Sequence, residues 1–83
     1  MISIEYTSHR TDLALRIRNT RIEQGYSTRH FATMVGISKS HLYDLERAKA
    51  SPTFDMLERI AAGLNTSVRD LVDFESSVRN DSR

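Results

Sequence analysis

A single glycine, Gly36, separates two short stretches that can each form about two turns of helix. The stretch before it, residues 28–35, has the small residue Ala32 four positions ahead of the glycine, which lets another helix approach closely. The stretch after it has two large aliphatic residues, Leu42 and Leu45, three positions apart. Glycine adopts positive φ readily and can therefore turn the chain sharply. The spacing predicts two helices that cross steeply, with the outer side of the second helix left free.

Start and stop signals predict five helices and no sheet, so the expected fold class is all-α. Serine and threonine favour helix N-caps, and glycine favours the position after a helix. The predicted helices run from about His9 or Asp12 to Gln24, Thr28 to Val35, Lys39 to about Arg47, Phe54 to Leu64, and Val68 to Val72. The most regular apolar stripe lies in the fourth helix and consists of Phe54, Leu57, Ile60, Ala61 and Leu64. The helical domain is expected over residues 9–74, and residues 75–83 are expected to be a flexible polar tail.

Within residues 1–8, Ile2, Ile4 and Tyr6 alternate with Ser3 and Glu5, which is typical of a short extended arm. In the first predicted helix, Leu15 and Ile22 lie roughly opposite the side that carries Leu13 and Ile17. A helix with two apolar sides needs two covers. The second cover can be the N-terminal arm or a partner subunit, and scattered surface aliphatics are the simpler alternative.

Several protein classes are disfavoured by what the chain lacks. Its 83 residues include no cysteine, which rules out a disulfide or a thiolate metal site. No apolar run approaches the roughly 18 residues of a membrane span, and the N-terminus lacks the pattern of a signal peptide. His9, His30 and His41 do not stand at metal-ligand spacing, and the three glycines form no phosphate-binding loop. We therefore expect a cytoplasmic protein that is not an enzyme and has no membrane partner, metal, cofactor or small-molecule ligand.

Basic residues are concentrated in the first half of the chain. The whole chain has a net charge of only +1, but residues 9–49 hold eight Lys and Arg residues against four Asp and Glu residues. Residues 50–83 hold four basic residues against six acidic ones. This asymmetry favours an anionic partner for the first half, although an ordinary solvated surface has the same composition.

Residues 25–64, "GYSTRHFATMVGISKSHLYDLERAKASPTFDMLERIAAGL", combine these signals in one order. The segment resembles the helix-turn-helix domain of the phage repressor and Cro family, also called the xenobiotic-response-element family, over about residues 12–73. The resemblance implies a five-helix fold, dimeric binding to double-stranded DNA, and transcriptional regulation. Two positions depart from the family pattern. Thr28 stands where glutamine is frequent, and Ala48 stands where glycine is usual, so the loop after the third helix can have a different shape.

The third helix has a polar side suited to reading bases in the major groove. Lys39, Ser40, Tyr43 and Asp44 are spaced so that they share the side opposite Leu42. Lysine can donate to guanine O6 and N7, aspartate can accept from cytosine N4, serine can do either, and tyrosine can donate or pack on a thymine methyl group. These four are the predicted base contacts, and a merely solvated helix side is the alternative.

Phosphate contacts are expected from residues that flank this side. The N–H groups at a helix N-terminus and the helix dipole favour phosphate, and basic side chains add salt-dependent affinity. The predicted phosphate contacts are Ser27, Thr28, Arg29, Arg47 and Lys49.

The family resemblance implies an ion pair between an arginine late in the first helix and a glutamate late in the third. Arg21 lies close to the inner stripe of its helix, and Glu46 directly follows the inward Leu45. We therefore interpret Arg21 and Glu46 as a structural pair rather than as catalytic groups.

The last predicted helix is a candidate dimer surface, because it has more apolar residues than one side of so short a helix can bury. The candidate interface residues are Val68, Leu71, Val72 and Phe74. A homodimer through this region would place two copies of the third helix about 34 Å apart, one turn of DNA. The alternative is that these residues complete the core of the monomer.

Helix-turn-helix folds also serve other functions. The alternative function is a protein-binding module, such as an antitoxin or a repressor-accessory domain, with weak DNA binding. The low net charge of the chain keeps this alternative open.

Overall fold

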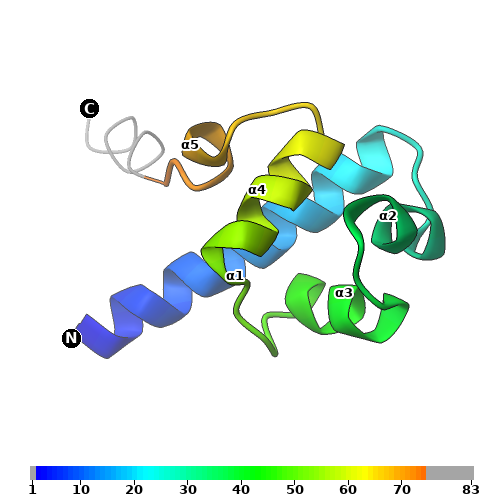
Figure 1. The fold of residues 1–83 in the computed structure, drawn as a ribbon. Coiled ribbons are helices and arrows are strands. Elements are labelled where there is room, and N and C mark those ends of the chain that lie inside the picture. Colours follow the sequence, from blue (N-terminus) through cyan, green and yellow to red (C-terminus); the bar gives the residue numbers. More distant parts are fainter. Residues whose placement is uncertain (1, 75–83) are drawn as a thin grey trace.

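The computed structural model describes the backbone of residues 2–74 and the side chains of residues 9–74. This part of the chain contains five α-helices and no strand, which confirms the predicted all-α class (Figure 1). The helices are α1 (Ile2–Glu23), α2 (Thr28–Val35), α3 (Lys39–Glu46), α4 (Phe54–Gly63) and α5 (Val68–Leu71). None of them has the length and apolarity needed to cross a membrane. The tail predicted over residues 75–83 lies outside the described residues.

The hydroxyl side chains before the last four helices act as N-caps. Each accepts a hydrogen bond from the backbone N–H three residues later, which satisfies one of the amide groups left unpaired at a helix start. The four caps are Ser27, Ser38, Thr53 and Ser67, and their donors are the N–H groups of His30, His41, Met56 and Asp70.

All five helices contribute to one hydrophobic core. Its buried members are Ile17 from α1, Phe31, Ala32 and Val35 from α2, Leu42 and Leu45 from α3, Ile60 and Ala61 from α4, Leu64 after it, and Leu71 from α5. Helix α1 contacts both α3 and α5, and these two helices lie on opposite sides of α4 in Figure 1. The core therefore holds α3 at one side of the molecule.

Residues 2–8 continue α1, so the prediction of an extended N-terminal arm is wrong. Alternation over so few residues is a weak signal, because a strand needs neighbouring strands to be stable, whereas a helix satisfies its backbone groups within one segment. The N-terminal end of α1 points away from the other helices (Figure 1). The arm therefore does not cover Leu15 and Ile22, which are 47% and 49% exposed.

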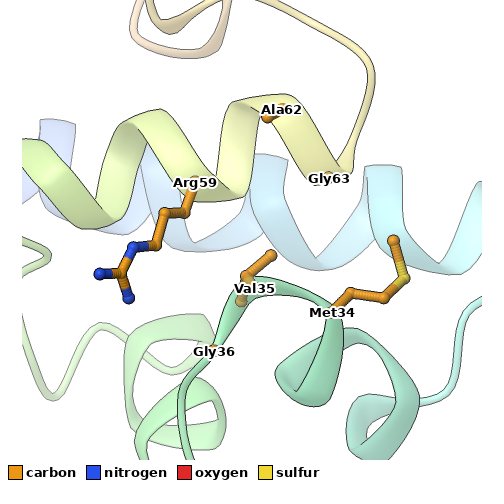
Figure 2. Close-up of a pocket in the computed structure, with 6 residues that line it drawn as sticks. All are labelled: Met34, Val35, Gly36, Arg59, Ala62 and Gly63. Carbon is orange, nitrogen blue, oxygen red and sulfur yellow. The ribbon is translucent and has the colours of Figure 1, made fainter.

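Helices α2 and α4 pack closely at Gly63. A Cβ atom at this position would lie 2.9 Å from Val35 Cγ1 and 3.0 Å from Phe31 Cε1. The small residues at this crossing leave a shallow hollow of about 530 Å³, with Arg59 of α4 at one end and Met34 of α2 at the other (Figure 2). Gly63 is therefore required for the contact between α2 and α4.

One residue of the predicted apolar stripe in α4 is not part of the core. Phe54 is 64% exposed, whereas Ile60 is fully buried. Phe54 is the first residue of the helix, where the chain has only just left the loop after α3. The helical period of the apolar residues therefore predicted the position of Phe54 wrongly. The period shows which side of α4 is apolar, but it does not show how far the neighbouring helices extend along that side.

Candidate nucleic-acid interface

Helices α2 and α3 are joined by a tight turn at Gly36. The glycine has φ 78° and ψ 33°, in the left-handed region, as the sequence predicted. The N–H of Ile37 donates to the carbonyl of Ala32 at 3.0 Å, and the N–H of Gly36 donates to Thr33 at 3.2 Å. These bonds close the end of α2. Two residues later Ser38 caps α3, so the turn and the cap determine where α2 ends and α3 begins.

Helix α3 has one buried side and one open side. Leu42, Leu45 and Glu46 are buried. The four residues predicted to contact bases are exposed and together line a shallow hollow of about 550 Å³; they are Lys39, Ser40, Tyr43 and Asp44. The structure therefore brings together one cation, one anion and two hydroxyls on one open surface. This set offers both donors and acceptors to a ligand.

The inner side of α3 is fixed by a buried ion pair. Arg21 Nε lies 2.8 Å from Glu46 Oε2, and Arg21 Nη2 lies 3.0 Å from Oε1, so the pair is bidentate. Arg21 Nη1 also donates to the carbonyl of Tyr26 at 2.7 Å. Arg21 and Glu46 are each only 7% exposed. The ion pair implied by the resemblance is present, and it ties α1 to α3 and to the loop before α2.

The N-terminus of α2 has free backbone donors next to a basic side chain. Ser27 uses its hydroxyl to cap the N–H of His30, and the first backbone bond of the helix comes from Phe31. The N–H groups of Thr28 and Arg29 are thus left outside the helical ladder, as at any helix start. Arg29 is exposed. This end of α2 can hold an anion by backbone N–H groups and one guanidinium.

Arg47, predicted to contact phosphate, is bonded to α3 itself. Its Nη1 donates to Tyr43 Oη, and its guanidinium carbon lies 4.8 Å from the centroid of the Tyr43 ring. Lys49, the other predicted cation at this end, is exposed on the following loop. The two basic residues at the end of α3 therefore have different surroundings.

The loop after α3 keeps a glycine-like shape although it contains alanine. Ala48 has φ 60°, in the left-handed region. The N–H of Lys49 donates to Asp44 at 2.9 Å, and the N–H of Ala48 donates to Leu45 at 3.2 Å. Ala48 thus adopts a conformation that suits glycine, and this strains the backbone because L-residues disfavour this region.

The predicted dimer residues lie mostly within the monomer. Leu71 is only 2% exposed and belongs to the core, so its assignment to a dimer interface is wrong. Val68 and Val72 are half-buried against the same core. Phe74 stacks on His9 with ring centroids 5.1 Å apart. The apolar residues of this segment therefore largely complete the core of the monomer. A helix as short as α5 has too few side chains to cover that core by itself.

The sequence did not predict that Arg16 binds the C-terminal end of α5. Arg16 Nη1 donates to the carbonyl oxygens of Asp70, Leu71 and Asp73 at 3.1–3.2 Å. The Arg16 guanidinium also lies 5.0 Å from the centroid of the Phe74 ring. These carbonyls are more than fifty residues away in the chain, so no local pattern reveals the contact.

Comparisons with known proteins agree with this architecture. The family model described as "Helix-turn-helix" matches residues 17–71. The transcriptional regulator SinR of Bacillus subtilis is 35% identical over 69 residues, which make up 82% of this chain and 62% of SinR. The chain thus spans less than two thirds of the length of this relative.

Two solved structures have a similar fold. A chain of the SinR–SinI protein complex has a TM-score of 0.73 at 34% identity and covers 80% of this chain and 65% of its own. The restriction-modification controller protein C.AhdI of Aeromonas hydrophila has a TM-score of 0.71 at 23% identity and covers 74% and 92%. The second similarity concerns the fold alone.

Proposed function

This chain belongs to the helix-turn-helix family, and we propose that it is a sequence-specific DNA-binding transcriptional regulator. The proposal rests on one observation, namely that α3 buries Leu42 and Leu45 and exposes a polar side that includes Lys39 and Asp44. An α-helix fits the major groove of B-DNA, where each base pair has its own pattern of donors and acceptors. SinR is named as a transcriptional regulator, which supports a binding function.

In the proposed complex, α3 enters the major groove with its N-terminal end first. Lys39 and Ser40 lie in the first turn of α3, and Lys39 donates to guanine O6 or N7. Asp44 lies one turn later and accepts from cytosine N4. Tyr43 lies beside Asp44 and contacts a base through its ring or its hydroxyl. Mixed polarity on one surface supports this role, because a nonspecific phosphate-binding surface is mainly basic.

The register of the protein on DNA is set by phosphate contacts. The N–H groups of Thr28 and Arg29 face one phosphate at the N-terminus of α2, and the Arg29 side chain adds charge. Ser27 contributes as the cap that positions these groups. Lys49 contacts a phosphate beyond the other end of α3. These contacts supply affinity for any sequence and most of the salt dependence.

One domain of this size contacts few bases, so we propose that it acts as a homodimer on a roughly palindromic operator. Two-fold symmetry places the two α3 helices about 34 Å apart, in successive major grooves. Val68, Val72 and Phe74 retain partial exposure and are the remaining candidates for the interface after Leu71 is excluded. Partner contact through the exposed Leu15 and Ile22 is the other arrangement.

Selection of binding sites from random duplex DNA tests the proposal and yields both half-site and spacing. Affinity for the selected site should fall steeply between 50 and 200 mM salt, by about 10³-fold or more if six or more phosphates are contacted. Lys39→Ala should weaken preference at one base pair, whereas Lys49→Ala should weaken binding to all sequences alike. Failure to enrich any sequence, with no salt-dependent binding to random DNA, would contradict the proposal.

A protein-binding module is the second candidate. Two large aliphatic side chains on one side of α1, Leu15 and Ile22, remain about half exposed in the described part of the chain. An exposed apolar surface of this kind can bind another protein. A chain that binds a protein but no DNA in the selection above would favour this second function.

A further inference from the structure

The outer side of α3 contains a pair of side chains that form a unit of their own. Arg47 donates from Nη1 to Tyr43 Oη and lies over the Tyr43 ring, with 4.8 Å between guanidinium carbon and ring centroid. The residues are four apart, which places them on the same side of the helix. Tyr43 is 52% exposed. Its ring is therefore oriented by Arg47 rather than by packing in the core.

We propose that Arg47 is a positioning residue that fixes Tyr43 as a hydrogen-bond donor to a base. This inference rests on the proposed function. Arginine is always protonated and only donates, whereas a phenolic oxygen both donates one hydrogen and accepts. Because Tyr43 Oη accepts from Arg47, the Tyr43 O–H is directed away from the guanidinium. Tyr43 lines the open hollow along α3, so in the proposed complex this O–H is available to a base.

The charge of Arg47 determines which base edge suits this donor. A guanidinium next to the phenol favours acceptors on DNA and disfavours amino groups. Guanine has two acceptors in the major groove, O6 and N7, whereas cytosine offers the N4 amino group. The Tyr43–Arg47 pair therefore favours a base that offers an acceptor, of which guanine has two, and rejects cytosine on the strand that it faces. Lys39 and Asp44 read other base pairs independently.

A plain phosphate role for Arg47 has different consequences. In that case the guanidinium leaves Tyr43 on DNA binding and neutralises a phosphate. Loss of Arg47 then lowers affinity for every sequence equally and reduces the salt dependence by about one ion. Lys49, exposed two residues later, serves as the matched control for this behaviour.

The test uses the full chain and the operator found by selection, together with operators changed at each base pair in turn. Arg47→Ala and Tyr43→Phe should each lower affinity for the selected operator about tenfold. Both should lose discrimination at the same base pair. The affinity of the double variant for the selected operator should be about the same as that of either single variant, because the two side chains act as a unit. Arg47→Lys should retain part of the discrimination, since lysine can still donate to Tyr43 Oη.

Three results would overturn the inference: a uniform loss for Arg47→Ala that matches Lys49→Ala, additive losses in the double variant, or loss of discrimination at different base pairs. Each leaves the proposed function intact, because the wild-type chain still selects an operator. Absence of any selected operator overturns both. Thermal melting of each variant separates binding effects from unfolding, and Tyr43→Phe, which keeps the ring, remains informative if Arg47→Ala melts early.

Discussion

Two arginines contact α3 from opposite sides, and their contacts differ in kind. Arg21 is buried and forms a bidentate pair with Glu46. Arg47 is exposed and lies on Tyr43. A buried charge that loses its partner is left unsolvated, whereas water replaces the partner of an exposed charge at little cost. The inner side of α3 therefore determines whether the domain folds, and the outer side is free to vary with the ligand.

The largest expected effect is loss of the inner contact. Glu46→Ala should lower the free energy of unfolding by about 3–5 kcal/mol, because it leaves Arg21 buried without a counter-charge. Urea denaturation measures this directly. Glu58→Ala is the control, since Glu58 is exposed on α4 and should change stability by less than about 0.5 kcal/mol. If Glu46→Ala and Glu58→Ala were equally stable, the inner side of α3 would not determine whether the domain folds.

A second test concerns the packing of α2 on α4. Gly63→Ala should destabilise the domain by about 1–3 kcal/mol, because the added methyl group would lie 2.9 Å from Val35 Cγ1. Helix propensity alone predicts the opposite sign, a gain of up to about 1 kcal/mol. The sign of the change in denaturation midpoint thus decides whether close packing or propensity prevails. A stabilised variant would contradict the tight crossing.

Relief of backbone strain after α3 should give a smaller effect of opposite sign. Ala48→Gly should stabilise the domain by about 1 kcal/mol, because glycine has no Cβ to strain at φ 60°. Asn65, at φ 59°, is the matched control. Asparagine tolerates this region better than alanine, so Asn65→Gly should gain less in melting temperature. A destabilised Ala48→Gly variant would contradict the strain.

The smallest effect on stability is expected on the outer side. Lys39→Ala should change the free energy of unfolding by less than about 0.5 kcal/mol, because Lys39 is exposed and makes no contact with the core. Its effect should appear in DNA binding instead. Comparison of its melting temperature with that of Glu46→Ala sharpens the contrast between the two sides. A loss above about 1 kcal/mol would show that the outer side also supports the fold.

Local signals predicted much of the fold. The caps at Ser27 and Ser38 and the left-handed turn at Gly36 follow from preferences of single residues, and the structure contains them. Contacts between distant segments were harder to predict. Leu71 looks like a surface residue in so short a helix, yet α1 and α4 cover it.

The same limit applies to the candidate site. The polar side of α3 follows from spacing alone, because exposed and buried residues alternate with the helical period. The contact of Arg47 with Tyr43 could have been suspected from their i, i+4 spacing. Spacing does not determine side-chain conformations, so it could not show whether Arg47 contacts Tyr43 or remains free and solvated.

The position of Arg21 also bears on how far the recognition unit can be separated from its surroundings. An excised peptide of residues 27–49 would contain both helices, both serine caps and the glycine turn. It would lack the guanidinium that joins Glu46 to the carbonyl of Tyr26, and the carboxylate would return to water. Such a fragment, or a graft of α3 alone onto another scaffold, should not keep the orientation of the helix. The helix-turn-helix of this protein is thus a part of the whole domain rather than a transferable cassette.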